Sequence, residues 1–140
     1  MIAALCVPPT RDAVQLYFRL HPNANINAEA VTGFLRVLSE QLAGPAVLVW
    51  DRLQAHRARI TQEFFMCHLQ LHPHFLPPYA PELNPDEGVW TILKRSLANT
   101  RPDSQDDLLS LLSRELRDLA GSQRRLRGCI SHSGLPPFLP

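Results

Sequence analysis

This sequence of 140 residues has little of several features that mark particular classes of protein. Its formal net charge is only +1, so no strong overall field is available to attract nucleic acid. Three widely spaced cysteines, Cys6, Cys67 and Cys129, argue against a disulfide framework and favour a reduced, cytoplasmic compartment. Residues 1–7 lack a basic leader and are too few for a signal peptide or membrane span, so we expect no membrane association.

The most distinctive stretch runs from Leu76 to Lys94, with the sequence LPPYAPELNPDEGVWTILK. Each proline fixes its own φ and restricts the residue before it, which predicts a stiff loop that leads into a helix. Asn84 suits the N-cap and Pro85 the first helical position, which places Glu87 three residues after the cap. That spacing is typical of a capping box, which is the commoner role of an acid in the first turn, and it also presents a carboxylate for chemistry at the start of the helix.

A second acidic residue follows a short apolar run. Ala46–Trp50 comes after Gly44 and Pro45, and its continuous apolar character predicts a strand buried on both faces. Asp51 lies where this strand ends, which is the usual position of catalytic groups in open α/β sheets. It could equally cap the turn that follows. The 35 residues from 52 to 86 leave room for a helix, a strand and the proline-rich loop, so Asp51 and Glu87 could converge at one edge of a sheet.

Hydrophobic periodicity predicts the remaining elements. The N-terminal residues form two antiparallel strands, and later segments alternate between helices and strands. The last 19 residues mix arginine, glycine and proline, so we expect a weakly ordered tail. The predicted strands are 2–7, 14–20, 46–50 and 69–76, and the predicted helices are 28–42, 60–67, one following Asn84, and 104–119.

These motifs together resemble a known family. Val49-Trp50-Asp51 with His56-Arg57, followed by the proline-rich block through Glu87 and by Trp90-x-x-x-Lys94, is similar to the DDE transposases. The similarity is strongest to the bacterial insertion-sequence-630-like branch of the mariner superfamily, and it covers about residues 1–100. It implies a ribonuclease H-like α/β fold, a mixed sheet with flanking helices, and a catalytic triad of two Asp and a final Asp or Glu.

On this resemblance, Asp51 matches the second carboxylate and Glu87 the third, whereas Asp86 occupies a position that is usually small or aliphatic. No acid matches the first Asp. Asp12 falls in the predicted turn between the first two strands, where a solvated role is expected. We therefore expect the sheet to lack its first, central strand. The implied organisation is a partial catalytic domain over 1–100, a C-terminal helix over 101–121 that packs on it, and the tail over 122–140.

The resemblance also implies a chemistry: metal-dependent cleavage and transfer of DNA strands. Two Mg²⁺ or Mn²⁺ ions would be held by Asp51, Glu87 and the absent Asp, so the chain alone is expected to be inactive. The first Asp is missing either because the gene is truncated by decay or because the transposase is encoded in two frames. The implied partners are transposon ends and target DNA, further copies of the chain and, in the two-frame case, an upstream-frame polypeptide that supplies the first Asp. The expected location is the cytoplasm, associated with the nucleoid when DNA is bound. The alternative is a non-catalytic DNA-binding or interaction remnant of a transposase.

Four basic residues near the two acids are candidate contacts for DNA phosphates. A structural role in a loop, or a solvated helix face, is the alternative for each. Zinc binding by Cys67 and the nearby histidines is not favoured, because their spacing lacks the paired ligands of a structural zinc site. The candidate DNA-binding residues are His56, Arg57, Lys94 and Arg95.

Overall fold

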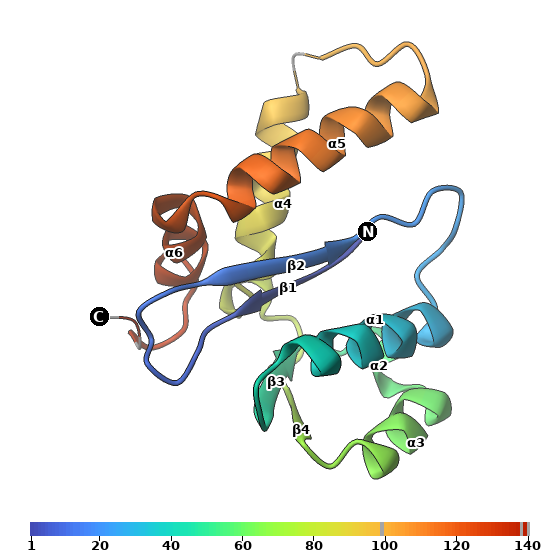
Figure 1. The fold of residues 1–140 in the computed structure, drawn as a ribbon, viewed down its shortest axis with the longest axis vertical. Helices are drawn as coiled ribbons and strands as arrows, with labels where there is room; N and C mark the ends of the chain where they lie inside the picture. Colours follow the sequence, from blue (N-terminus) through green and yellow to red (C-terminus); the bar gives the residue numbers. More distant parts are fainter. Residues whose placement is uncertain (99, 138, 140) are drawn as a thin grey trace. The chain divides into compact units, whose positions relative to one another are not determined.

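The computed structural model describes residues 1–98, 100–137 and 139. The chain divides into two compact units. The first combines residues 1 and 3–22 with residues 82–140, and the second comprises residues 23–81 together with Ile2. Both units mix helices with a small two-stranded sheet, so the chain is an α/β protein, as the sequence predicts (Figure 1).

The first unit is built on a pair of strands, β1 (Ile2–Cys6) and β2 (Gln15–Arg19), which run in opposite directions (Figure 1). Three helices accompany them: α4 (Asp86–Leu97), α5 (Gln105–Ala120) and α6 (Gln123–Ser131). A single 3-10 turn, η1 (Pro81–Leu83), precedes α4. Asp12 is exposed in the loop between the strands, as expected of a turn residue.

The core of the first unit joins one strand to all three helices. Val89 and Leu93 of α4, Leu116 and Leu119 of α5, and Leu126 of α6 are each at most 2% exposed. Helix α5 begins as the sequence predicts, because the Ser104 hydroxyl accepts a hydrogen bond from the Asp107 amide at 3.1 Å. This packing fixes the helix that carries Glu87.

The expectation of a weakly ordered tail is wrong for residues 123–131, which form α6. The Ser122 side chain caps the helix, and Leu126, Cys129 and Ile130 recur at helical spacing and are buried. The Gln123 amide accepts from the Val14 N–H at 2.9 Å and donates to the Val14 carbonyl at 2.8 Å. These contacts supply the burial and hydrogen bonds that composition alone did not reveal.

The second unit contains three helices, α1 (Ala28–Gln41), α2 (Gln54–Arg57) and α3 (Arg59–Cys67), and two strands, β3 (Ala46–Trp50) and β4 (Leu71–Phe75). Asn27 caps α1 through a 2.9 Å hydrogen bond from the Ala30 amide. Helix α1 contacts α2 and α3. The predicted strand and helix positions agree closely, whereas the short helix α2 was not predicted.

Strands β3 and β4 pair in parallel, with Ala46 opposite Leu71 and Trp50 opposite Phe75. The Ala46 amide donates to Gln70, and Leu76 donates to Trp50. In a parallel ladder the bonding residues of each strand alternate, so the main-chain groups of Val47 and Val49 point away from β4. Within the described part of the chain this sheet has two strands, which leaves that edge of β3 open.

The predicted burial of strand β3 is wrong. Strand β3 was expected to be buried on both faces, but Val47 and Val49 are 67% and 50% exposed. Ile60, at the start of α3, is also 40% exposed. The sequence pattern correctly identifies apolar positions, but nothing in the second unit covers this side of β3.

No helix among the described residues is long and apolar enough to cross a membrane. The three cysteines are unpaired thiols in different environments. Burial raises the pKa of Cys6 to about 11, and burial followed by the charge of Asp86 raises the pKa of Cys129. These two thiols are therefore protonated and weakly nucleophilic at neutral pH.

Candidate active site

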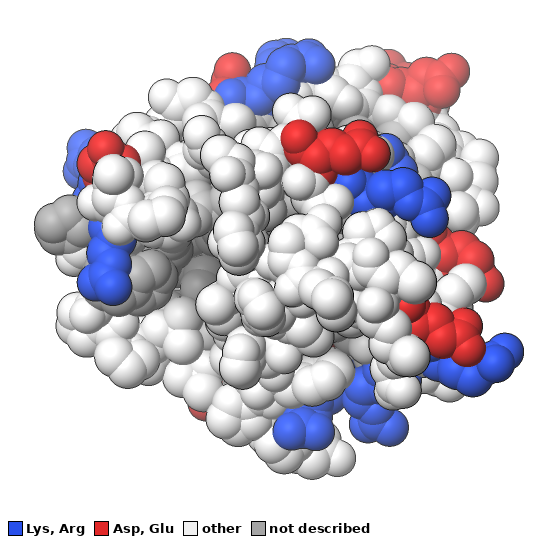
Figure 2. Space-filling model, turned by 60° about the horizontal axis from the view of Figure 1, so that its bottom comes forward, with Lys and Arg blue, Asp and Glu red and all other residues white. Residues whose placement is uncertain are grey.

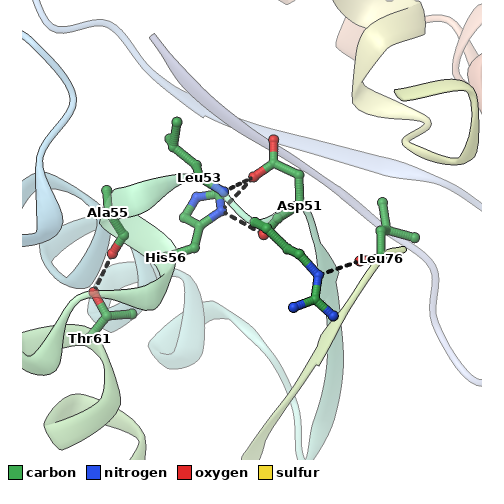
Figure 3. Close-up of polar contacts among 7 residues, drawn as sticks. Asp51, Leu53, Ala55, His56, Thr61 and Leu76 are labelled. Carbon is green, nitrogen blue, oxygen red and sulfur yellow. Dashed lines mark hydrogen bonds and ion pairs between the residues drawn. The ribbon is translucent and has the colours of Figure 1, made fainter. Parts of the chain in front are cut away.

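Asp51 follows the last residue of β3, at the carboxyl end of a parallel strand. Its Oδ1 accepts hydrogen bonds from the Leu53 amide at 2.9 Å and from His56 Nδ1 at 2.8 Å (Figure 3). The side chain is nevertheless 53% exposed. The turn-capping role weighed from the sequence is thus realised through one oxygen, and the carboxylate stays accessible to solvent.

Aromatic side chains support this turn. The His56 ring stacks on Trp50 with a centroid distance of 4.2 Å and an interplanar angle of 13°. Trp50 is buried and also contacts Phe75, the last residue of β4. Arg52 Nε donates to the Leu76 carbonyl at 3.2 Å, which ties the Asp51 turn to the end of β4 (Figure 3). The ends of both strands therefore hold Asp51 in place.

Glu87 lies in the first turn of α4 and is exposed. The Asn84 side chain accepts from the Asp86 amide at 3.2 Å, and the Asn84 carbonyl accepts from the Glu87 amide at 3.1 Å. The Asn84 side chain therefore binds an amide of the first turn, although the helix begins at Asp86 with Pro85 at its N-cap position, one residue later than predicted. Among the described residues the Glu87 carboxylate takes no part in this capping, so the capping-box alternative is not realised and its oxygens remain solvent-accessible.

Asp86 has a different environment from its neighbour. It is partly buried, and its charge contributes to the raised pKa of Cys129 on α6. Gly88 allows this close approach of α4 and α6, because a Cβ there would lie 3.0 Å from the Cys129 Cα. Asp86 thus belongs to the packed side of α4 and Glu87 to the solvent side, a difference that favours Glu87 as the reactive acid.

The predicted site residues fall into two groups. Asp51, His56 and Arg57 belong to the second unit, where Asp51 and His56 are in direct contact and Arg57 is exposed at the end of α2. Glu87, Lys94 and Arg95 belong to the first unit, where all three are exposed on α4. The structure thus brings Asp51 and His56 into contact. The two groups of residues belong to different units of the chain.

The donors suit a hard divalent cation in kind but not in number. Exposed carboxylates are the ligands that Mg²⁺ and Mn²⁺ prefer. Among the residues that the structure describes, no three His, Cys, Asp or Glu side chains are grouped to hold a metal ion. Cys67, His68, His72 and His74 likewise form no such group.

Sequence reasoning missed the roles of Trp50 and Leu53. Trp50 supplies the surface on which His56 stacks, and Leu53 supplies the amide that binds Asp51. An Asp followed two residues later by a free amide is the pattern of an Asx turn, so the second role had a sequence signal. The stacking had none, because it depends on how α2 returns towards β3.

Charge is distributed without a dominant sign. On the face drawn in Figure 2, blue basic and red acidic side chains are interspersed among a larger uncharged area. This agrees with the small formal charge of the sequence. Any contact with DNA would depend on a few individual side chains, because a broad basic surface is not seen on this face.

Comparison with solved structures places the fold among transposase catalytic domains, which are ribonuclease H-like. The catalytic domain of Mos1 mariner transposase superposes with a TM-score of 0.56 at 18% identity, over 91% of this chain and 72% of that one. The chain in the Mos1 strand transfer complex gives a TM-score of 0.56 at 20% identity, with 91% and 42% covered. The Mos1 paired-end complex with the left transposon end gives 0.57 at 19%, with 94% and 43% covered.

The sequence itself matches the DDE superfamily endonuclease family over residues 13–109. This match spans more than half of the chain and includes both Asp51 and Glu87. The chain therefore belongs to the DDE superfamily endonuclease family. A comparison with curated proteins found no match. The chain spans less than half the length of the chains in the two Mos1 DNA complexes just described.

Proposed function

We propose that this chain supplies the second and third carboxylates, Asp51 and Glu87, of a transposase site that cleaves and joins DNA in a complete catalytic domain. The observation that carries the proposal is the position of Asp51. It follows a parallel strand within the matched family region and keeps an accessible carboxylate. The exposed Glu87 carboxylate on the first turn of α4 supports it.

The bound cations would be Mg²⁺ or Mn²⁺, which activate the attacking oxygen and neutralise the leaving one in phosphoryl transfer. Solved complexes of the Mos1 catalytic domain with raltegravir contain Mn or Mg, which supports this assignment by analogy. Asp51 and Glu87 would each offer one hard ligand. Arg57, Lys94 and Arg95 are exposed cations that would contact the phosphates of transposon ends and target DNA.

The first Asp would come from an upstream-frame polypeptide, as in a split transposase of the insertion-sequence-630-like branch. The two edges of the β3–β4 sheet support this idea. On β4, Pro73 lacks an amide and occupies an outward-facing position, so that edge is unsuited to another strand. On β3, Val47 and Val49 lie at an edge where no other strand pairs in the described part of the chain, and their apolar side chains are exposed, which suits an added strand.

The chain alone should have no catalytic activity. We expect negligible cleavage of a DNA fragment carrying transposon ends in the presence of Mg²⁺ or Mn²⁺. Turnover that disappears in the Asp51→Ala variant would contradict this expectation. A salt-dependent gel shift that survives Asp51→Asn and Glu87→Gln would instead favour the alternative, a non-catalytic DNA-binding remnant.

Complementation tests the split-site proposal directly. The chain would be co-expressed with the polypeptide encoded immediately upstream of Met1, and cleavage of transposon ends would be measured. We expect activity that is abolished by Asp51→Asn or Glu87→Gln and retained by Glu82→Gln, a matched change at an exposed acid of η1. Activity that survives Asp51→Asn, or an upstream region without an Asp-bearing apolar strand, would refute the proposal.

A further inference from the structure

Tyr79 has the most exposed of the large hydrophobic side chains among the described residues. It lies in the loop that follows β4, and its relative exposure is 101%, so solvent reaches the ring from every side. The side chain therefore buries no apolar surface within the chain. Packing gives no reason for an aromatic residue at this position.

The backbone of Tyr79 is also unusual. Pro78 and Tyr79 form a turn, and the φ angle of Tyr79 is 57°, which lies in the left-handed region. A turn position that follows proline and requires a positive φ is normally occupied by glycine or asparagine, because a bulky side chain is strained there. Tyrosine thus strains the backbone and contributes no packing. This combination is typical of a residue that serves function and not folding.

The loop holds the ring in a fixed place. Three of the residues 77–81 are prolines, which fix their own φ angles and lack an N–H. The loop starts at Leu76, whose amide donates to the Trp50 carbonyl at 2.8 Å and whose carbonyl accepts from Arg52 Nε at 3.2 Å (Figure 3). Because few main-chain donors remain in the loop, the faces of the tyrosine ring are its main binding surface.

This ring belongs to the same end of the sheet as Asp51. The residues on either side of Asp51 both bond to Leu76. Tyr79 comes three residues later, so its Cα lies within about 11 Å of the Leu76 Cα. Arg52 is exposed and supplies a positive charge at this end. Exposed aromatic faces together with cations are the means by which proteins bind single-stranded nucleic acids.

We propose that Tyr79 is a stacking platform for an unpaired base of a DNA strand that is bound at this end of the sheet. Every base has a π face, so stacking on Tyr79 would hold the strand without reading its sequence. The inference rests on the proposed function, which brings DNA to Asp51. It adds a contact that the exposed cations do not make, because they bind phosphates in single strands and duplexes alike.

The chain offers a direct test because it contains only two tyrosines, Tyr17 and Tyr79. The full chain, with ¹³C-labelled tyrosine rings, would be titrated by NMR with a single-stranded oligodeoxynucleotide and separately with a long duplex. We expect the single strand to move the Tyr79 ring signals upfield, through the ring current of the stacked base, while Tyr17 of β2 serves as the internal control. The duplex should move them less, since its bases stack on one another. An unmoved Tyr79 signal, or an equal shift with the duplex, would overturn the proposal.

Substitutions then measure what the ring contributes, with fluorescence anisotropy of a labelled single strand as the readout. Tyr79→Gly removes the ring and suits the positive φ, so it should fold normally by circular dichroism and bind about fivefold more weakly or worse. Tyr79→Phe keeps the ring and should bind like wild type. If Tyr79→Gly does not fold, Tyr79→Asn replaces it, because asparagine also tolerates this backbone conformation.

Leu69→Ala is the matched control, because it shortens another exposed apolar side chain, at the opposite end of β4. It should bind like wild type. Equal affinity of wild type and the folded variant without the ring would overturn the stacking role, as would a wild-type chain that does not bind single-stranded DNA.

The stacking role and the proposed function can fail separately. An unresponsive Tyr79 in a chain that completes an active transposase on complementation would overturn the stacking role alone. A Tyr79 ring that responds to single-stranded DNA in a chain that fails complementation would support stacking and count against the split catalytic site.

Discussion

The two units of this chain differ in how completely they cover their apolar side chains. In the first unit, five leucine and valine side chains from three helices are at most 2% exposed, and they form one cluster with Leu16 of β2 and with Val14, which precedes that strand. In the second unit, nine large hydrophobic side chains are at least 40% exposed. These nine residues are Val37, Val47, Val49, Leu53, Ile60, Met66, Leu69, Phe75 and Tyr79.

This difference follows from the sheets. A two-stranded sheet is marginal by itself, and parallel strands normally have both faces covered. In the first unit, three helices pack with the strand pair and cover its apolar side chains. In the second unit, one edge of β3 pairs with no other described strand, and the Val47 and Val49 side chains are exposed. The two acids lie on opposite sides of this contrast. Glu87 lies on a helix whose apolar side is buried in the core of the first unit, whereas Asp51 follows a strand whose sheet has room for further strands.

The largest expected effect comes from creating a cavity in the core of the first unit. Leu116→Ala removes a fully buried side chain and should lower the free energy of unfolding by about 2–5 kcal/mol. Leu69→Ala, the same change at a residue that is 76% exposed in the second unit, should alter it by about 0.5 kcal/mol or less. Urea denaturation would measure both, and similar losses would show that the two units do not differ in packing.

A smaller loss is expected where two helices of the first unit touch. Gly88→Ala would place a Cβ 3.0 Å from the Cys129 Cα, so the helices must separate and stability should fall by about 1–3 kcal/mol. Gly121→Ala is the control, because its Cβ would lie 3.6 Å from the nearest atom, the Arg117 carbonyl oxygen. Thermal unfolding followed by circular dichroism would compare them. Equal melting temperatures would contradict the tight α4–α6 contact.

The docking of α6 should contribute about as much as one or two hydrogen bonds. Gln123→Leu removes both bonds to Val14 and should cost about 1–3 kcal/mol, since it leaves the main chain of the buried Val14 without these partners. Gln123→Glu keeps an acceptor for the Val14 amide but loses the donor to the Val14 carbonyl. It should therefore lower the free energy of unfolding by no more than Gln123→Leu does. Amide hydrogen exchange at Val14 would report the change. Unaltered protection of the Val14 amide in the Gln123→Leu variant would contradict a stabilising role of these two hydrogen bonds.

The smallest effect on stability, and the clearest test of the open sheet, is expected at β3. Val49→Lys should change the free energy of unfolding by about 0.5 kcal/mol or less, because Val49 is half exposed. It should reduce self-association in analytical ultracentrifugation, since lysine on an edge strand opposes strand pairing. Val37→Lys, at a 43% exposed valine of α1, is the matched control. Equal self-association of the two variants would argue against strand pairing at the open edge of β3.

Much of the local structure was predictable because it depends on neighbouring residues. Asn27 and Ser104 begin their helices where the sequence places them, and the Asn84 side chain accepts from the Asp86 amide at the start of the helix that carries Glu87. The apolar run ending at Trp50 correctly placed a strand and set Asp51 at its end. Capping and periodicity act over a few residues, so the sequence alone records them.

What the sequence determined by itself was the order and type of most elements, the places of Asp51 after a strand and of Glu87 in the first turn of a helix, and the family to which the chain belongs. Only the tertiary structure decided that residues 123–131 become a helix, that Asp86 is partly buried while Glu87 is exposed, and that His56 stacks on Trp50 beside Asp51. Those outcomes depend on contacts between residues far apart in the chain or on the return of a turn. The physical reason is that burial is a property of the assembled surface, and no local pattern specifies which surface will be covered.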